Sequence, residues 1–239
     1  NLAELQNVCS KLFKISPDET LSIVQDLYEK KLVTYPRTDA RVLSTAVAKE
    51  IYKNISGLRN YPQAGEAAQG ALELGAYKNI AKTRYTNDKQ ITDHYAIIPT
   101  GQGLGALKGL SLTAQRVYET IVRRFLSIFY PPAVYQKVSL VTKMENESFF
   151  SSFKVLLSEG YLKIAANSFA KKSMAEASGK TPESEGEGEV SCDEALLAAL
   201  QKLKKGDILN INGLGIKEGE TSPPKRYNSG SMILAMENA

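Results

Sequence analysis

The spacing of hydrophobic residues divides the chain into a helical part and a part richer in strands. Leucine and valine recur three to four residues apart through residues 17–31, and Ser16 opens a capping-box sequence with proline at the first helical position. Pro131-Pro132 closes the helical part, because proline cannot continue a helical hydrogen-bond ladder. The same period predicts four further helices before that point: around residues 2–12, from Ser44 through Ile51, over 62–74 and from Thr113 onward.

After Pro132 the period shortens toward the alternation typical of strands. Residues 134–142 and 149–157 are rich in β-branched and aromatic residues, and residues 145–147 between them form a turn sequence, so we expect a hairpin. Four more segments are predicted: strands at Tyr161–Ala165 and Asp207–Ile211, and helices at Asp193–Leu203 and Ser229–Asn238.

These elements predict an α+β protein of more than one domain. We expect a mainly helical domain over residues 1–130, a β-rich segment over 131–222, and the start of a following domain at 223–239. The stretch of about 170–190 is rich in Ser, Glu and Gly without apolar periodicity, which is typical of a mobile loop. The chain begins with Asn1 rather than Met, so we interpret it as a piece of a longer polypeptide.

Composition narrows the classes of function. Residues 1–130 carry 17 Lys/Arg against 12 Asp/Glu, whereas residues 131–239 carry 13 against 14, so a polyanion would prefer the first half. Cys9 and Cys192 are far apart and only one histidine is present, which excludes the usual Cys/His zinc site and favours a reducing cytoplasm. No apolar run approaches the length of about 18 residues that a membrane helix needs, so no membrane partner is expected.

Residues 32–39 (Leu-Val-Thr-Tyr-Pro-Arg-Thr-Asp) place a proline between a tyrosine and an arginine. A residue before proline is extended, and residues two apart in an extended segment point the same way, so Tyr35 and Arg37 are expected on one side. A phenol with a pKa of about 10 is a poor nucleophile, but a nearby guanidinium stabilises the phenolate and its planar fork fits a phosphate. The pair suits attack on a phosphodiester that leaves a phosphotyrosine ester. The plainer interpretation is a half-buried strand aromatic beside a surface charge.

Residues 93–100 (Asp-His-Tyr-Ala-Ile-Ile-Pro-Thr) hold the only histidine of the chain. Asp93 precedes His94, and a carboxylate can orient an imidazole and raise its pKa. A protonated His94 could pair with a DNA phosphate or donate to the leaving oxygen, and an ordinary core or surface histidine is the alternative.

Further side chains are candidates for supporting roles. Thr38 and Asp39 follow the Tyr35 motif, and Asp39 could either fix Arg37 or cap the turn before Leu43. Six basic residues are candidates for phosphate contact, although each alone also fits a solvated helix face: Arg41, Lys82, Arg84, Arg116, Arg123 and Arg124.

The two motifs resemble the active-site regions of type IA DNA topoisomerases, in particular the topoisomerase III branch. Residues 16–39 resemble the segment around that family's active-site tyrosine, and residues 93–100 resemble its histidine motif. Residues 123–132 and 217–227 resemble the segments that follow in the family's order. Three positions depart from the pattern, namely Ala40, Tyr95 and Ser229-Gly230.

The resemblance implies a mechanism and an architecture. Tyr35 would attack single-stranded DNA and hold its 5′ phosphate, Arg37 would stabilise that phosphate, and His94 would position it. The fold implied is a torus, with a helical tyrosine domain and a β-rich arch, and the protein would act as a monomer together with the remaining domains of the parent polypeptide. The family's acidic Mg²⁺ site lies in a domain absent here, so we expect this chain alone to bind no metal and to be inactive.

Rival classes fit less well. A tyrosine recombinase needs its tyrosine near the C-terminal end, and a metal-dependent relaxase needs clustered histidines. A non-catalytic module that binds single-stranded DNA by stacking bases on some of the 12 tyrosines is an alternative of another kind, as is an interaction domain without DNA affinity.

Overall fold

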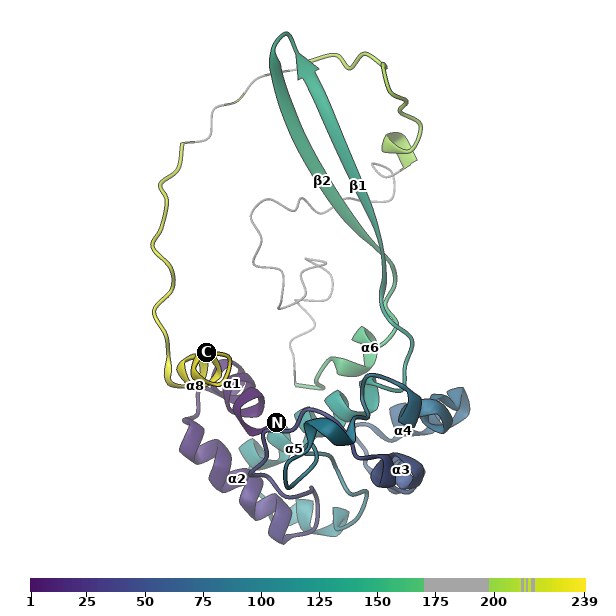
Figure 1. The fold of residues 1–239 in the computed structure, drawn as a ribbon, viewed down its shortest axis with the longest axis vertical. Coiled ribbons are helices and arrows are strands. Elements are labelled where there is room, and N and C mark those ends of the chain that lie inside the picture. The colour runs from purple at the N-terminus through teal and green to yellow at the C-terminus, as the bar shows by residue number, and fades with distance from the viewer. Residues whose placement is uncertain (170–197, 212, 214, 216–217) are drawn as a thin grey trace. The chain divides into compact units, whose positions relative to one another are not determined.

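The structure, a computed structural model, describes residues 1–169, 198–211, 213, 215 and 218–239 (Figure 1). The chain divides into two compact units. The first consists of Asn1–Pro132, Gly160–Ala170 and Arg226–Ala239, and the second of Ala133–Glu159 and Lys171–Lys225. The first unit therefore gathers three stretches that are far apart in the sequence.

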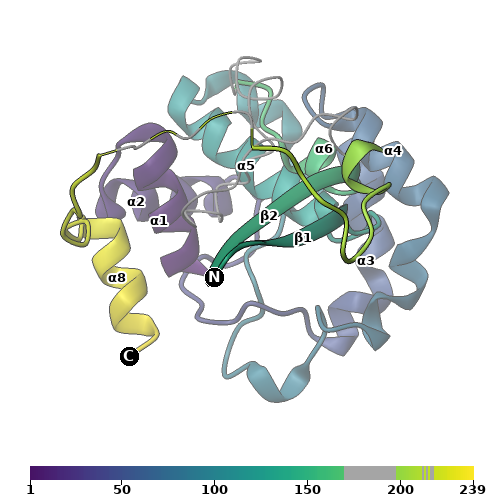
Figure 2. The same ribbon diagram turned by 90° about the horizontal axis from the view of Figure 1, so that it is seen from above.

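The regular secondary structure described in the first unit consists of helices and short helical turns joined by loops, and Figure 2 shows them from a second direction. None of the described helices is long and apolar enough to cross a membrane. The α-helices are α1 (Leu2–Phe13), α2 (Pro17–Glu29), α3 (Thr45–Gly57), α4 (Gly65–Leu74), α5 (Leu112–Ser127), α6 (Leu162–Ala165) and α8 (Ser229–Glu237). The 3-10 turns are η1 (Leu58–Asn60), η2 (Ala76–Lys82), η3 (Asp88–Gln90) and η4 (Leu104–Gly109).

Serine hydroxyls begin three of these helices. Ser16, Ser44 and Ser111 each accept a hydrogen bond from the backbone N–H three residues later, at 3.1–3.2 Å, which satisfies a donor that the helix leaves unpaired. The helices predicted over 17–31, after Ser44 and near Thr113 are confirmed as α2, α3 and α5. The helices predicted around 2–12 and over 62–74 are also confirmed, as α1 and α4.

The hydrophobic core of the first unit centres on α5, which packs against α2, α4 and α6. Val117, Val122 and Leu126 of α5 are fully buried, as is Leu27 of α2. Burial of a full apolar side chain contributes roughly 1.5–3 kcal/mol. Cys9 of α1 also lies in this core, and burial raises the pKa of its thiol to about 12, so the thiol stays protonated and unreactive.

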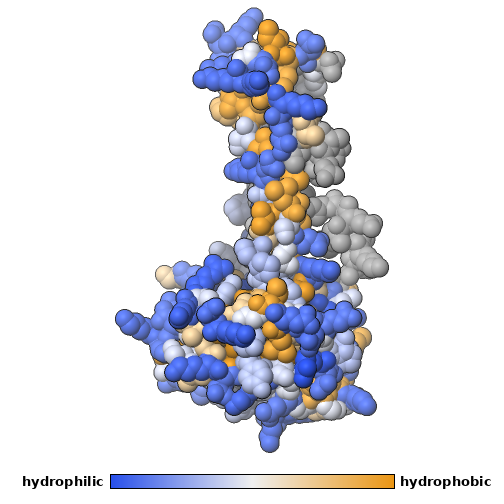
Figure 3. Space-filling model, turned by 90° about the vertical axis from the view of Figure 1, so that its right-hand side faces the viewer, coloured by the Kyte–Doolittle hydropathy of each residue, from blue (hydrophilic) through white to orange (hydrophobic). Residues whose placement is uncertain are grey.

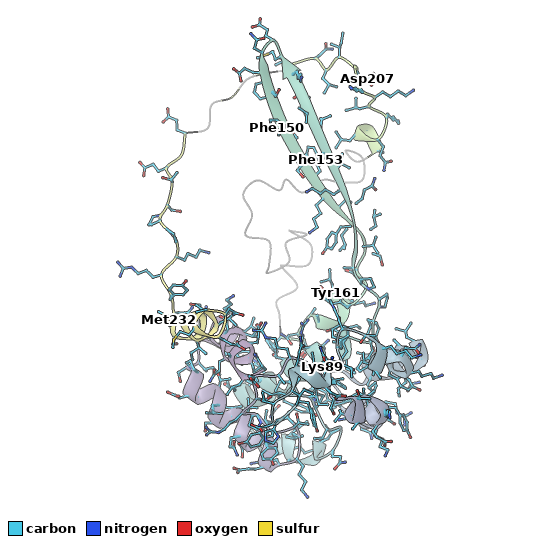
Figure 4. The ribbon with its side chains drawn as sticks, in the orientation of Figure 1. Lys89, Phe150, Phe153, Tyr161, Asp207 and Met232 are labelled. Atoms are coloured by element: carbon cyan, nitrogen blue, oxygen red, sulfur yellow. The ribbon has the colours of Figure 1, made fainter. Side chains whose placement is uncertain are left out.

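A two-stranded antiparallel hairpin forms the described β-structure of the second unit. Strands β1 (Val134–Met144) and β2 (Glu147–Ser158) pair with Val141 opposite Phe150, and Glu145 adopts φ 55° in the two-residue turn. Hydrophobic side chains lie at its surface (Figure 3), and Phe150 is 80% exposed. Figure 4 labels Phe150 and Phe153, which point to opposite faces of β2 because their spacing is odd. The predicted hairpin is confirmed, and the combination of helices with a sheet is α+β in this coarse sense.

The strand predicted at Tyr161–Ala165 is wrong, because this segment forms the helical turn α6. Gly160 has φ +48° and turns the chain, and the Tyr161 N–H then donates to the Pro131 carbonyl at 2.9 Å. The N–H groups of the following residues bond locally, Ile164 N–H donating to the Tyr161 carbonyl at 3.0 Å. Figure 4 labels Tyr161 beside α6.

The strand predicted at Asp207–Ile211 is also wrong. These residues have no strand assignment, and Ile208 is 92% exposed. A β-strand needs a partner for its backbone groups, and the described residues supply none here. Of the helix predicted at Asp193–Leu203, residues 198–200 are helical and residues 193–197 lie outside the described residues, as does the loop predicted at about 170–190.

Helix α8 packs side by side with α1, as Figures 1 and 2 both show. Its predicted start is confirmed, with the Asn228 side chain accepting from the Ser231 N–H at 2.8 Å. Gly230 is buried there, and a Cβ at this position would lie 2.8 Å from Cβ of Ser10. A glycine therefore lets the two helices approach closely.

A buried ion pair fastens α6 and its flanking residues to α5. The Glu119 carboxylate accepts from Arg123 Nε at 2.5 Å and from the backbone N–H and hydroxyl of Ser168, both at 2.7 Å. Arg123 also donates to the carbonyls of Gln63 (2.6 Å) and Ile164 (3.2 Å). The two charged side chains are only 4% and 13% exposed, so each depends on the other for compensation.

We predict that Glu119→Ala lowers the free energy of unfolding by about 3–5 kcal/mol, because it leaves the Arg123 charge largely buried without its partner. Urea unfolding followed by circular dichroism measures this. The control is Glu29→Ala at the exposed end of α2, where a change within about 0.5 kcal/mol is expected. Equal losses in the two variants would contradict the prediction.

Candidate active site around Tyr35

A short antiparallel pairing joins the two motifs that the sequence singles out. The Thr100 N–H donates to the Leu32 carbonyl and the Thr34 N–H donates to the Ile98 carbonyl, both at 3.0 Å. Val33, between the two paired positions, forms a bridge with Pro99, and both are buried. The buried residues anchor the pairing in the core below.

Two threonine hydroxyls reinforce this pairing. The Thr34 hydroxyl donates to the Ala96 carbonyl at 3.1 Å and accepts from the Ile98 N–H at 2.9 Å. The Thr38 hydroxyl donates to the His94 carbonyl at 2.8 Å, which fixes the backbone of the histidine itself. Both motifs are therefore held in one register by side chains as well as by backbone.

The pairing brings the rings of Tyr35 and His94 into contact. Their centroids lie 4.3 Å apart with the planes tilted by 40°. Tyr28 contacts Tyr35 edge-on, at 5.5 Å and 85°. Tyr35 is half-buried and His94 is exposed, so the nucleophile candidate is held by two rings while its surroundings stay open to solvent.

Tyr28 is a site residue that the sequence reasoning missed. Its helical period suggests that it faces inward with Leu27, but Tyr28 is 39% exposed. It lies in the last turn of α2, and the chain then turns at Lys31 (φ 62°) and returns toward Tyr35. An aromatic residue in the last helical turn, directly before a short loop into a motif, is the signal that could have identified it.

Arg37 is exposed while the preceding Pro36 is buried. Within the described part of the chain, no hydrogen bond or ion pair engages its guanidinium, and no ring or polar contact joins it to Tyr35 or His94. The expectation that Tyr35 and Arg37 present their side chains on one side stays a prediction. An exposed guanidinium is available to a phosphate without first breaking an internal ion pair.

The acidic candidates make few contacts. A side-chain oxygen of Asp39 accepts from the Thr92 hydroxyl at 3.5 Å, and its carbonyl accepts from the Asn1 side chain at 3.2 Å. Asp93 is exposed and, among the residues described, makes no hydrogen bond to the His94 ring. Among the described residues Asp39 makes no contact with Arg37, and the supporting roles of both carboxylates stay predictions.

The six basic candidates separate into engaged and available side chains. Arg41 forms ion pairs with Glu4 and Glu237, both at 3.2 Å, and thereby joins the end of the Tyr35 motif to α1 and α8. The Arg116 guanidinium lies 5.3 Å from the centre of the Phe169 ring. Arg84 lies over the ring of Tyr85, and Arg123 is committed to Glu119. Of these six candidates, only Lys82 and Arg124 are exposed and have no such partner among the described residues.

Burial sets Tyr35 apart from the tyrosines of the core. Tyr61 and Tyr118 pack edge-to-face at 5.2 Å, and burial raises the pKa of both phenols, which keeps them protonated. Groups in such positions are poor nucleophiles. The half-buried Tyr35 is therefore better placed for attack than these two.

The described residues contain no group of three or more His, Cys, Asp or Glu side chains that could hold a metal ion. Mg²⁺ requires oxygen ligands from carboxylates or substrate phosphates in near-octahedral geometry. The side chains present around Tyr35 do not fit such a centre.

Comparison with known proteins matches the sequence of this chain to one family. The family model for DNA topoisomerase matches residues 1–239. The chain is 36% identical over 239 residues to DNA topoisomerase 3 of Bacillus licheniformis and 34% identical to that of Bacillus subtilis, covering all of this chain and 30% of each relative. A DNA topoisomerase 3 of Bacillus cereus is 31% identical over 242 residues, with the same coverage. The chain thus spans about 30% of the length of the curated relatives it matches.

The family match runs from the first to the last residue and includes both motifs that meet at Tyr35. The three relatives carry the same name. The chain therefore belongs to the DNA topoisomerase family, as a type IA, topoisomerase III-like member.

Proposed function

We propose that Tyr35 is the nucleophile of a DNA strand-passage reaction. Its phenolic oxygen attacks a backbone phosphorus of single-stranded DNA, the bond from phosphorus to the 3′ oxygen breaks, and the 5′ phosphate stays on Tyr35 as an ester. The phenol gives up its proton and the leaving 3′ oxygen gains one, so the step is balanced. Religation is the reverse attack by the 3′ hydroxyl, which needs no added energy source because the ester conserves the bond.

The observation that carries this proposal is the contact between the Tyr35 and His94 rings. Two motifs from separate parts of the sequence meet at a half-buried phenol, which is the arrangement that a positioned nucleophile requires. His94 would bind or orient the phosphate beside Tyr35. The exposed Arg37 would hold its non-bridging oxygens as charge builds on phosphorus.

The wider assignments belong to the same proposal. The parent protein would relax or decatenate DNA in the cytoplasm as a monomeric torus, with residues 1–130 as the tyrosine domain and the hairpin region as part of the arch. The family implies Mg²⁺, but the described residues of this chain do not offer a site for it, so no step above passes through a metal. The 239-residue chain alone would be inactive in relaxation.

We predict that Tyr35→Phe abolishes formation of a covalent DNA adduct. Phenylalanine keeps the ring contacts and removes only the attacking oxygen, so folding and DNA affinity should be unchanged. The full natural polypeptide that contains this chain is mixed with a labelled single-stranded oligonucleotide, stopped with denaturant and resolved on a gel. Tyr227→Phe, which alters a 65% exposed phenol, is the matched control and should retain the adduct.

An adduct that persists in Tyr35→Phe would assign the nucleophile elsewhere. Absence of any adduct in the wild type, together with tight and equal DNA binding by both proteins, would leave the non-catalytic DNA-binding module as the function.

We predict that Thr34→Val slows adduct formation and lowers the free energy of unfolding by about 1–3 kcal/mol. Valine keeps the shape but leaves the Ala96 carbonyl and the Ile98 N–H without their partner, which loosens the segment that carries His94. Thr34→Ser restores the hydroxyl and should restore the rate. If Thr34→Val lowers stability but forms the adduct at the wild-type rate at saturating DNA, the hydroxyl has only a structural role.

We predict that Tyr28→Ala lowers the rate of adduct formation at saturating DNA by about 2- to 10-fold, because an aromatic pair contributes about 0.5–1.5 kcal/mol to holding the Tyr35 ring. Tyr28→Phe keeps the edge contact and should behave as wild type. The affinity for DNA separates this role from base stacking. A weaker affinity with an unchanged saturated rate would contradict a positioning role.

A further inference from the structure

A groove between α3 and η2 lies outside the site described above. It encloses about 550 Å³. Six residues line it, and none of them belongs to the cluster of Tyr28, Tyr35 and His94: Ala48, Lys49, Tyr52, Tyr77, Lys78 and Ala81. We call it the lysine–tyrosine groove.

Two tyrosine rings offer apolar flat surfaces in this groove. The centroids of Tyr52 and Tyr77 lie 6.4 Å apart with the planes tilted by 33°. Tyr52 is 50% exposed, although a large aromatic side chain on α3 gains free energy from burial. Ala48 and Ala81 are small, so a flat ligand can approach the rings.

The charge around the groove is positive. Lys49 and Lys78 are both exposed, and Lys82 ends the same turn η2. One carboxylate, that of Asp88, acts electrostatically on Lys49. It accepts from the Thr45 hydroxyl at 2.6 Å and from the Thr45 N–H at 2.8 Å. The hydrogen bonds from Thr45 lower the pKa of Asp88, so it stays ionised at neutral pH and offsets part of the charge of Lys49.

Glu50, also on α3, forms an ion pair with Lys53. Among the described residues neither Lys49 nor Lys78 forms an ion pair, so both ammonium groups can bind an anionic ligand. A ligand that fits must combine a flat ring with closely spaced negative charges.

We propose that the lysine–tyrosine groove is a second docking site for single-stranded DNA, in which a base stacks on Tyr52 and Tyr77 while Lys49 and Lys78 bind the flanking phosphates. Stacking on tyrosine tolerates any base, and lysine ammonium groups are point charges that suit a flexible backbone. The lining side chains hold no fork of donors and acceptors for reading base edges, so binding is sequence-tolerant. Duplex DNA fits poorly, because its bases are stacked inside the helix. The choice of DNA as the ligand rests on the proposed function. The groove and its lining residues are described independently of that function.

The first test replaces the rings. In the full natural polypeptide that contains this chain, Tyr52→Ala with Tyr77→Ala should weaken binding of a labelled single-stranded oligonucleotide about 5- to 150-fold for one stacked base. Tyr52→Phe with Tyr77→Phe keeps both rings and should bind as wild type. A matched effect on duplex DNA of the same length would overturn the proposal.

The second test replaces the charges. Lys49→Ala with Lys78→Ala should reduce the slope of log affinity against log salt by about 1.4, which corresponds to two phosphates on a single strand. Lys11→Ala with Lys108→Ala removes two exposed lysines elsewhere in the first unit and is the charge-matched control. Equal slopes for the two pairs would overturn the proposal.

A third test locates the DNA directly. An oligonucleotide carrying 5-iododeoxyuridine should crosslink on irradiation to a peptide that contains Tyr52 or Tyr77, and crosslinks confined to other peptides would overturn the proposal.

The Tyr35 adduct distinguishes the groove proposal from the proposed nucleophile. If the adduct forms and the groove variants bind like their controls, the groove proposal fails alone. If no adduct forms but binding depends on the groove, the proposed nucleophile fails alone.

Discussion

The pairing of residues 32–34 with residues 98–100 is the constraint on which the candidate site depends. Backbone hydrogen bonds set the two segments side by side, but a shift by one residue would turn every side chain to the opposite face. Thr34 opposes that shift because its hydroxyl both donates to Ala96 and accepts from Ile98. The buried Val33 and Pro99 add an apolar cost to any other register. The contact between Tyr35 and His94 is a consequence of this register.

Tyr35 is half-buried and contacts two rings, whereas Arg37 is exposed. The chemistry proposed for the two side chains explains this difference. An attacking oxygen gains from a fixed position, because orientation is a large part of the barrier to a displacement. Tyr35, the proposed nucleophile, contacts the rings of both Tyr28 and His94. A phosphate-binding guanidinium gains from staying hydrated until the ligand arrives, because a buried charge without a partner is costly. Arg37 is exposed, which is consistent with a group that waits for its anion.

Local sequence signals made the helices predictable. The segments that were predicted wrongly are those whose structure depends on tertiary contacts. Serine caps act within one turn, so Ser16 and Ser44 could be identified from the sequence alone. Ser111 caps α5 two residues before the predicted start at Thr113. The segment 161–165 is too short for its period to separate helix from strand, and a hydrogen bond to the distant Pro131 decided it. The residues of the two motifs could be named beforehand, but the contact of Tyr28 with Tyr35 depends on how the chain turns at Lys31. The sequence places Tyr28 in the last helical turn before the motif, but the contact itself is made by the tertiary path of the chain after Lys31.

The role of each basic residue was the hardest property to predict from the sequence. An arginine can either form an ion pair within the fold or stay free to bind a polyanion. The excess of basic residues over 1–130 suggests a broad surface for a polyanion. Yet Arg41 joins Glu4 and Glu237, and Arg123 compensates the buried Glu119, so these cations are part of the fold. A phosphate that bound either arginine would compete with these internal carboxylates. Net charge therefore overstates the number of cations in this unit that are free of an internal partner and ready to bind a polyanion.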